Sequence, residues 1–265
     1  MPVFATPGPI TLQVNFPAGD LTVTASARED TTVEVTPANR DSDADLAYAA
    51  SVSVEHVNGT VLIKAPEDTS RLRRTPAVHI VVALPAGSRL IAGTAAGDTR
   101  ATGVYGNVDF SSASGDLHLH RAAALTAKTA SGDVTCDVVD GVTDITNTSG
   151  DIRVTKAAGA LSIQAVSGAV RVGHAASDVD ITSTSGDVTV QSVTTGRVVL
   201  NSTSGDTAVA VTPGSAVWLD LNSLTGRVTS TLHQSEEPAQ GEQTVEITAR
   251  SLSGSIAVTR AEAAQ

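Results

Sequence analysis

A short motif that recurs at near-constant spacing through the last two-thirds of the chain constrains the fold most. Ser-Gly-Asp occurs five times, first at Ser114-Gly115-Asp116 and last at Ser204-Gly205-Asp206. Including variants such as Ser167-Gly168-Ala169, successive motif glycines are 18, 17, 18, 18, 18, 19, 21 and 28 residues apart. These glycines are Gly97, Gly115, Gly132, Gly150, Gly168, Gly186, Gly205, Gly226 and Gly254. Such a repeat is typical of an array of stacked units.

Apolar residues alternate with polar ones on both sides of each motif glycine. The positions seven and five before it, and two and four after it, are mainly aliphatic, as with Ile145, Ile163 and Ile181. This period of two predicts two short strands per unit, each with one buried face. The position three before the glycine is usually Ser or Thr, and we expect these hydroxyls to bond turn amides. We expect the glycine to supply a positive φ at this corner.

Two all-β architectures satisfy this pattern. In a β-solenoid, parallel two-sided coils of about 18 residues stack on one another. In an antiparallel β meander, the same strands form consecutive hairpins. The solenoid is favoured because aliphatic residues also occupy the second corner of the unit, where a hairpin tip would expose them: Val139, Ala157, Ala175 and Val193. A meander would also need about 18 strands in one open sheet, beyond the usual limit of about 10.

The first 88 residues alternate in polarity but depart from the repeat, so we expect an irregular β-strand cap over the first coil. Asn58-Gly59, between two apolar runs, predicts a hairpin turn. Polar stretches at 39–45 and 67–74 predict loops.

The chain therefore divides into a cap region, 1–88, and a β-solenoid repeat domain, 89–265. The repeat domain contains a polar insertion, His233–Gln243, and ends in a short polar tail, Thr259–Gln265. Because this tail offers little to cover the last coil, the open sheet edge there predicts a monomer or an end-to-end dimer.

The composition of the chain limits the kinds of function that it can have. Hydrophobic residues make up 41% of the chain but aromatic ones only 2%, and the net charge is −11. Only Tyr105 and Trp218 are candidate platforms for a sugar ring, and an acidic surface repels nucleic acid. Cys136 is the single cysteine, which excludes an internal disulfide. Neither a secretion signal nor a membrane span is predicted, so the expected location is cytoplasmic, or surface or secreted if an export signal has been trimmed.

Repeated acidic residues are the most conspicuous polar feature. Six of the nine motif glycines are followed by Asp, and these side chains would stack in a ladder about 4.8 Å apart: Asp98, Asp116, Asp133, Asp151, Asp187 and Asp206. Calcium could relieve the repulsion between these carboxylates, but we favour acceptance of turn amides. A cluster of histidine and aspartate side chains is expected on the outward face of a strand, and such side chains can bind a divalent metal ion. We favour an ordinary solvated surface over a metal site. Its candidate residues are His118, His120, Asp116, Asp133 and Asp137. We predict no cofactor and no catalytic residue.

Units such as Ser131-Gly132-Asp133-Val134 resemble those of the bacterial "putative adhesin" family, a domain of unknown function with β-strand repeats. The resemblance covers about Leu90 to Val258. It implies an architecture, places relatives in cell-surface or envelope-stress contexts, and carries no catalytic residues.

The sequence favours a non-enzymatic binding or scaffold protein that presents flat β faces to a protein partner. The motivating observation is a regular repeat that is poor in aromatic residues. One alternative is a cell-surface adhesin or envelope-stress protein. A second alternative is a carbohydrate-active β-helix enzyme.

Overall fold

The computed structural model describes residues 1–66, 75–232 and 243–261. The chain divides into two compact units, Met1–Thr135 and Cys136–Gln265, and each is considered by itself. The boundary expected at residue 88 falls inside the first unit. The loop expected at 67–74 and all but the last residue of the polar insertion lie outside the described residues.

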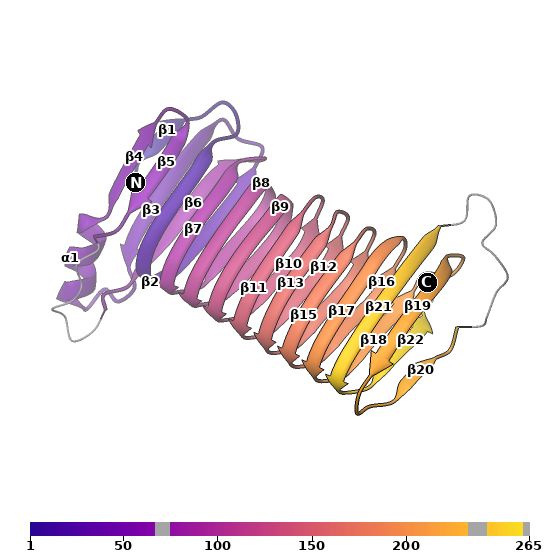
Figure 1. The fold of residues 1–265 in the computed structure, drawn as a ribbon. Helices are drawn as coiled ribbons and strands as arrows, with labels where there is room; N and C mark the ends of the chain where they lie inside the picture. The colour runs from indigo at the N-terminus through magenta and orange to yellow at the C-terminus, as the bar shows by residue number, and fades with distance from the viewer. Residues whose placement is uncertain (67–74, 233–242, 262–265) are drawn as a thin grey trace. The chain divides into compact units, whose positions relative to one another are not determined.

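The strands of the second unit form two rows, and neighbouring strands within each row pair in parallel (Figure 1). One row contains β11 (Thr143–Ser149), β13 (Leu161–Ser167), β15 (Val179–Ser185) and β17 (Gly196–Ser204). The other contains β12 (Ile152–Ala157), β14 (Val170–Ala175), β16 (Val188–Val193) and β18 (Thr207–Val211). Ile145 pairs with Ile163, and Ile163 with Ile181. The β-solenoid is therefore confirmed, and the antiparallel meander is wrong.

Inward side chains form continuous aliphatic columns between the two rows. Ile145, Ile163 and Ile181 are at most 1% exposed. The second corner is equally closed, since Ala175 and Val193 are also at most 1% exposed. A single coil buries too few side chains to offset the entropy of ordering about 18 residues, so stability comes from stacking.

The first unit contains the same kind of coil. β7 (Arg89–Ala96) pairs in parallel with β8 (Thr99–Ser114), and β8 with β9 (Leu117–Ser131). Leu90, Val108 and Leu125 are successive register partners in this stack. β10 (Val134–Val139) spans the boundary between the units.

Motif glycines bring the backbones of successive coils into contact. A Cβ added at Gly186 would lie 2.1 Å from the carbonyl oxygen of Gly168, and φ is +129° there. A positive φ is confirmed at seven of the nine motif glycines and is wrong for Gly97 and Gly226. At these two, an added Cβ would still lie 1.7 and 2.0 Å from a carbonyl oxygen of the neighbouring coil. Close approach is therefore the more general reason for glycine.

We expect Gly186→Ala to lower the free energy of unfolding by about 3 kcal/mol or more, because it combines a strained φ with a backbone clash. Chemical denaturation measures the change. Gly8→Ala is the control, since nothing lies within 4 Å of a Cβ added there. Equal stability of the two variants would contradict the close-packed corner.

A further coil lies within the N-terminal stretch, where the sequence pattern missed it. β2 (Thr11–Ser26) pairs in parallel with β7 and β8 on one side. On the other side it pairs with β5 (Thr60–Lys64) and β6 (Val78–Pro85). Gly19 stands next to Gly97 in the glycine column. The coil built from 11–26 is thus inserted between coils that follow it in the sequence.

Antiparallel strands and one helix complete the first unit. β3 (Asp30–Pro37) pairs with β6, and β1 (Val3–Ala5) pairs with β3. β4 (Ser53–Val57) forms the predicted hairpin with β5, with φ of 50° at Asn58 and 74° at Gly59. The loop expected at 39–45 is wrong in part, because α1 (Asp43–Ser51) begins there, after its N-cap residue Ser42. A carboxylate-rich first turn and a Ser cap favour that helix start.

The C-terminal end of the second unit shows a similar insertion. β21 (Thr244–Ser253) and β22 (Ile256–Arg260) pair with β17 and β18 on one side. On the other side they pair with β19 (Ala216–Ser223) and β20 (Val228–Ser230). The outermost described coil is therefore β19 and β20, and the expectation that the chain's last residues follow the final coil is wrong.

Candidate functional site

The aspartates of the motif bind the backbone of the next coil. In the first unit, the Asp116 N–H donates to Oδ1 of Asp98 (3.0 Å), and the Asp133 N–H donates to Oδ1 of Asp116 (2.8 Å). In the second unit, Oδ1 of Asp187 accepts from the Asp206 N–H (2.9 Å), and Oδ1 of Asp206 accepts from the Ser255 N–H (2.8 Å). The expected acceptance of turn amides is confirmed, with the amide supplied by the neighbouring coil. This aspartate ladder joins coil to coil.

An arginine and a histidine side chain also contact carboxylates at this corner. Arg171 Nη1 lies 3.3 Å from Oδ2 of Asp151, and His79 Nδ1 lies 2.9 Å from Oδ2 of Asp20. These pairs are at the surface, so each contributes at most about 1 kcal/mol. The Arg171 guanidinium, together with the amides, offsets part of the repulsion along the ladder.

Asp206→Ala should lower the free energy of unfolding by about 1 kcal/mol, because the Ser255 N–H loses its acceptor. Asp206→Asn keeps an acceptor oxygen and removes one charge, so we expect stability equal to or above that of the parent chain. Denaturant titrations of both variants measure this difference. If Asn and Ala were equally destabilising, the carboxylate would act through its charge and the ladder would need another explanation.

The candidate metal ligands are partly adjacent in the structure, and the Asp133 N–H donates to the Asp116 carboxylate (2.8 Å). His118 and His120 lie on the outward face of β9, where both are exposed. His120 Nδ1 is 3.1 Å from the Gly103 carbonyl oxygen, and Asp116 is engaged by the ladder. Asp137 belongs to the second unit. Within the described ranges, no group of three or more His, Cys, Asp or Glu side chains could hold a metal ion.

A column of small hydroxyls stands three residues before the motif glycines, and the structure corrects its expected role. Six of the seven side-chain oxygens are buried and have no hydrogen-bond partner in the described structure, so they do not bond turn amides. The seventh residue is Ser223, whose hydroxyl donates to the Gly254 carbonyl (2.8 Å). The six residues without a partner are Thr94, Ser112, Thr129, Ser183, Ser202 and Ser251. An unpaired buried hydroxyl costs roughly 1–3 kcal/mol. Small volume at the corner therefore explains these residues better than local hydrogen bonding.

We expect Ser183→Ala to raise the free energy of unfolding by about 1 kcal/mol, because it removes a buried hydroxyl that lacks a partner. Its register partner is already alanine, Ala165, which is 4% exposed. Ser88→Ala is the control: the Ser88 hydroxyl donates to the Pro85 carbonyl (2.7 Å) and accepts from the Ile10 N–H (3.0 Å). That change should destabilise the chain. Destabilisation by both changes would show that the Ser183 hydroxyl is satisfied.

Sequence reasoning missed a polar network beside the second corner of the second unit. His174 Nδ1 is 3.3 Å from the Ser192 hydroxyl, which lies 3.1 Å from that of Thr212. Nearby, Arg260 donates to the carbonyls of Thr212 (3.2 Å) and Ser215 (2.9 Å). The signal was the register of β14, β16 and β18, which brings residues about 18 to 20 apart together. A serine beside a histidine suits nucleophilic catalysis only when a third group orients the histidine. In the described structure the network leads instead to hydroxyls and to a guanidinium that binds carbonyls.

Buried titratable side chains have structural partners. Burial raises the pKa of Tyr105, whose hydroxyl donates to the Val23 carbonyl at 2.8 Å. Tyr105 is 1% exposed and cannot serve as a sugar platform, unlike Trp218, which is 59% exposed. Burial, and secondarily the charge of Asp137, raise the pKa of the Cys136 thiol to about 12. A buried thiol with so high a pKa is a weak nucleophile at neutral pH.

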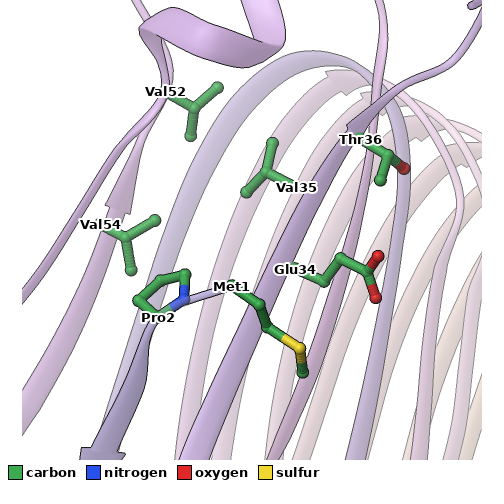
Figure 2. A pocket seen from close by; sticks show the side chains of 7 residues that line it. All are labelled: Met1, Pro2, Glu34, Val35, Thr36, Val52 and Val54. Carbon is green, nitrogen blue, oxygen red and sulfur yellow. The ribbon is translucent and has the colours of Figure 1, made fainter.

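A hollow of about 380 Å³ lies in the first unit beside the cap strands (Figure 2). Its walls are formed by Met1, Pro2, Glu34, Val35, Thr36, Val52 and Val54. The lining is mainly apolar with one carboxylate, and it is open to solvent. Such a lining holds few of the converging polar groups that orient a small ligand.

Stacked parallel coils joined by a glycine column and an aspartate ladder define a β-solenoid repeat module. Residues 10–259 match the Toastrack DUF4097 family, and the chain belongs to that family. A comparison with curated proteins finds no match. No helix among the described residues has the length and apolar character needed to cross a bilayer.

Three solved structures are similar to this chain at low identity. A putative lipid binding protein from Parabacteroides distasonis ATCC 8503 is 12% identical, with a TM-score of 0.48 over 98% of this chain and 96% of that one. A putative adhesin from the same organism is 10% identical, with a TM-score of 0.40 over 97% and 95%. A putative adhesin from Bacteroides fragilis NCTC 9343 is 12% identical, with a TM-score of 0.35 over 97% and 95%.

Proposed function

We propose that this protein is a non-enzymatic binding or scaffold module whose broad face holds a protein partner. The broad face is the outward side of β11, β13, β15 and β17. The observation that carries the proposal is its regular register. One outward column joins Thr146, Gln164, Thr182 and Asn201 through consecutive parallel pairs. A second joins Asp144, Ser162, Asp180 and Val199.

The chemistry of these columns suits recognition of a polypeptide surface. Hydroxyl and amide groups can donate and accept hydrogen bonds, and short side chains such as Thr182 lose little conformational entropy when they are held. The strands beneath them pair on both sides, so the surface is rigid before binding. A preorganised surface lowers the cost of association.

Charge indicates the kind of partner. Asp144 and Asp180 are exposed on the broad face, and the chain as a whole carries a net charge of −11. Complementary potentials steer association and select partners. A protein segment with basic residues therefore fits this face better than an acidic one.

The positions of the side chains that could act in catalysis support a non-enzymatic role. The most strongly shifted pKa values belong to Tyr105 and Cys136, and both residues are buried in the core. Perturbed catalytic groups are instead expected in a cleft. Among the described residues, His174 and Ser192 are arranged most like a nucleophile and a base, and they form part of a hydroxyl network.

A photo-crosslinking residue at Thr182, in extracts of the native host, tests the proposal. We expect a specific adduct that excess parent protein competes away and that excess Thr182→Arg competes away at least tenfold less well. The matched control carries the crosslinker at Thr189, an outward position of the other row. Equal adducts at both positions, or none that the parent protein displaces, would refute a binding role for the broad face.

A further inference from the structure

The outermost coil of the second unit leaves its inward side chains partly uncovered. Leu219 and Leu221 of β19 are half-buried, whereas their register partners one coil further in, Ile247 and Ala249, are 0% exposed. Val228 of β20 is 41% exposed, and its partner Ile256 is 0% exposed. The aliphatic columns therefore reach the end of the described stack without a closing layer.

This end also presents a sheet edge that can accept another strand. In the part of the chain that the structure describes, β19 pairs with one strand only, β21. All eight of its residues are in continuous register, and the segment contains neither Lys nor Pro. Proteins usually protect such an edge with those residues, with a bulge or with a covering segment. The first unit does so, because β3 and β4 pair antiparallel with the outer parallel coil.

Apolar side chains adjoin the open edge. Trp218 is 59% exposed, Leu224 is 72% exposed and Leu252 is 52% exposed. The neighbouring insertion, His233–Gln243, has three glutamates, and its apolar residues are limited to Pro238 and Ala239. Its composition offers little area to bury leucine and tryptophan side chains. An occupant with its own apolar edge is needed.

We propose that this occupant is a second copy of the chain, paired antiparallel on β19 in a two-fold symmetric dimer. A two-fold axis sets the same surface of both copies together and closes the assembly, so no open edge is left on this row. It also brings the uncovered ends of the aliphatic columns into contact. Head-to-tail stacking does not fit, since the outer parallel coil of the first unit is already covered by antiparallel strands.

Side-chain alternation and charge restrict the register of the pair. Inward residues must face inward residues, so the axis passes through a residue rather than between two. An axis at Asp220 would set two carboxylates directly opposite, which is unfavourable. An axis at Leu219 places Trp218 opposite Asp220 of the other copy. An axis at Leu221 places Asn222 opposite Asp220 of the other copy. Both join leucine to leucine.

Dilution of the parent chain, followed by light scattering and tryptophan fluorescence, tests the dimer. Trp218 is the single tryptophan of the chain, so its emission should shift to the red as the dimer dissociates. We expect Leu221→Arg to raise the dissociation constant at least tenfold, or about 1.4 kcal/mol. Val166→Arg, on an exposed valine of β13, should leave it unchanged. Thermal denaturation checks that both variants fold.

Cysteine crosslinking provides a test that does not depend on destabilising the edge. The native Cys136 is buried, so an introduced thiol reports alone. Leu219→Cys or Leu221→Cys should form a disulfide between copies, according to which residue lies on the axis, and Thr146→Cys should form none. A monomer at high concentration, a chain that polymerises, or crosslinking at neither edge position would each overturn the proposal. A monomer with blue-shifted Trp218 emission would assign the cover to the chain itself.

Discussion

Contact between the backbones of successive coils is the constraint on which the remaining structure depends. At the motif corner, the space for a Cβ is taken by a carbonyl oxygen of the neighbouring glycine, 2.1 Å away at Gly186 and 2.3 Å away at Gly205. This contact fixes the level at which each coil meets the next. Residues about 18 apart then become register partners, and the inward alternation on both sides of the corner adds up to aliphatic columns. A close-packed backbone corner therefore sets the core, and the core stabilises coils that could not fold singly.

The same spacing decides how polar residues fit around the corner. An aspartate directly after the glycine can reach the next backbone N–H, as Asp187 does with Asp206, so a repeated charge becomes a repeated link between coils. Three residues before the glycine, the space is small and closed, and most hydroxyls there lack partners. Asn147 shows a satisfied alternative: its side chain accepts from the Ser149 N–H and donates to the Gly150 carbonyl. One corner position thus strengthens the stack while another weakens it, and both follow from fixed geometry.

The repeat was predictable from the sequence because most coils contain the residues that set their register, namely a glycine, an aspartate and alternating aliphatic residues. The order of coils at the ends was not, because pairing in a stack is decided by contacts between segments far apart in the chain. Gly19-Asp20 carries the motif, but 78 residues separate Gly19 from Gly97, so spacing could not place them together. The α1 helix was not predicted for a different reason: one cap residue and a short segment are weak signals of a helix in a sequence whose polarity mostly alternates with a period of two. Among the site residues, the aspartates followed from the motif, whereas the contact of His174 with Ser192 needed the exact level of two coils.

Inserting the terminal segments one coil inward has a physical consequence for the ends of the stack. The coil 11–26 and the coil of β21 and β22 each have neighbours on both sides, so neither of these coils lies at an open end of the parallel stack. The outer coil of the second unit is instead made from β19 and β20. This coil is internal in the sequence, so the chain holds it at both ends. Tethering at both ends lowers the entropy that such a coil gains by detaching. It can therefore keep an apolar edge in place, although no strand among the described residues covers the outer side of β19.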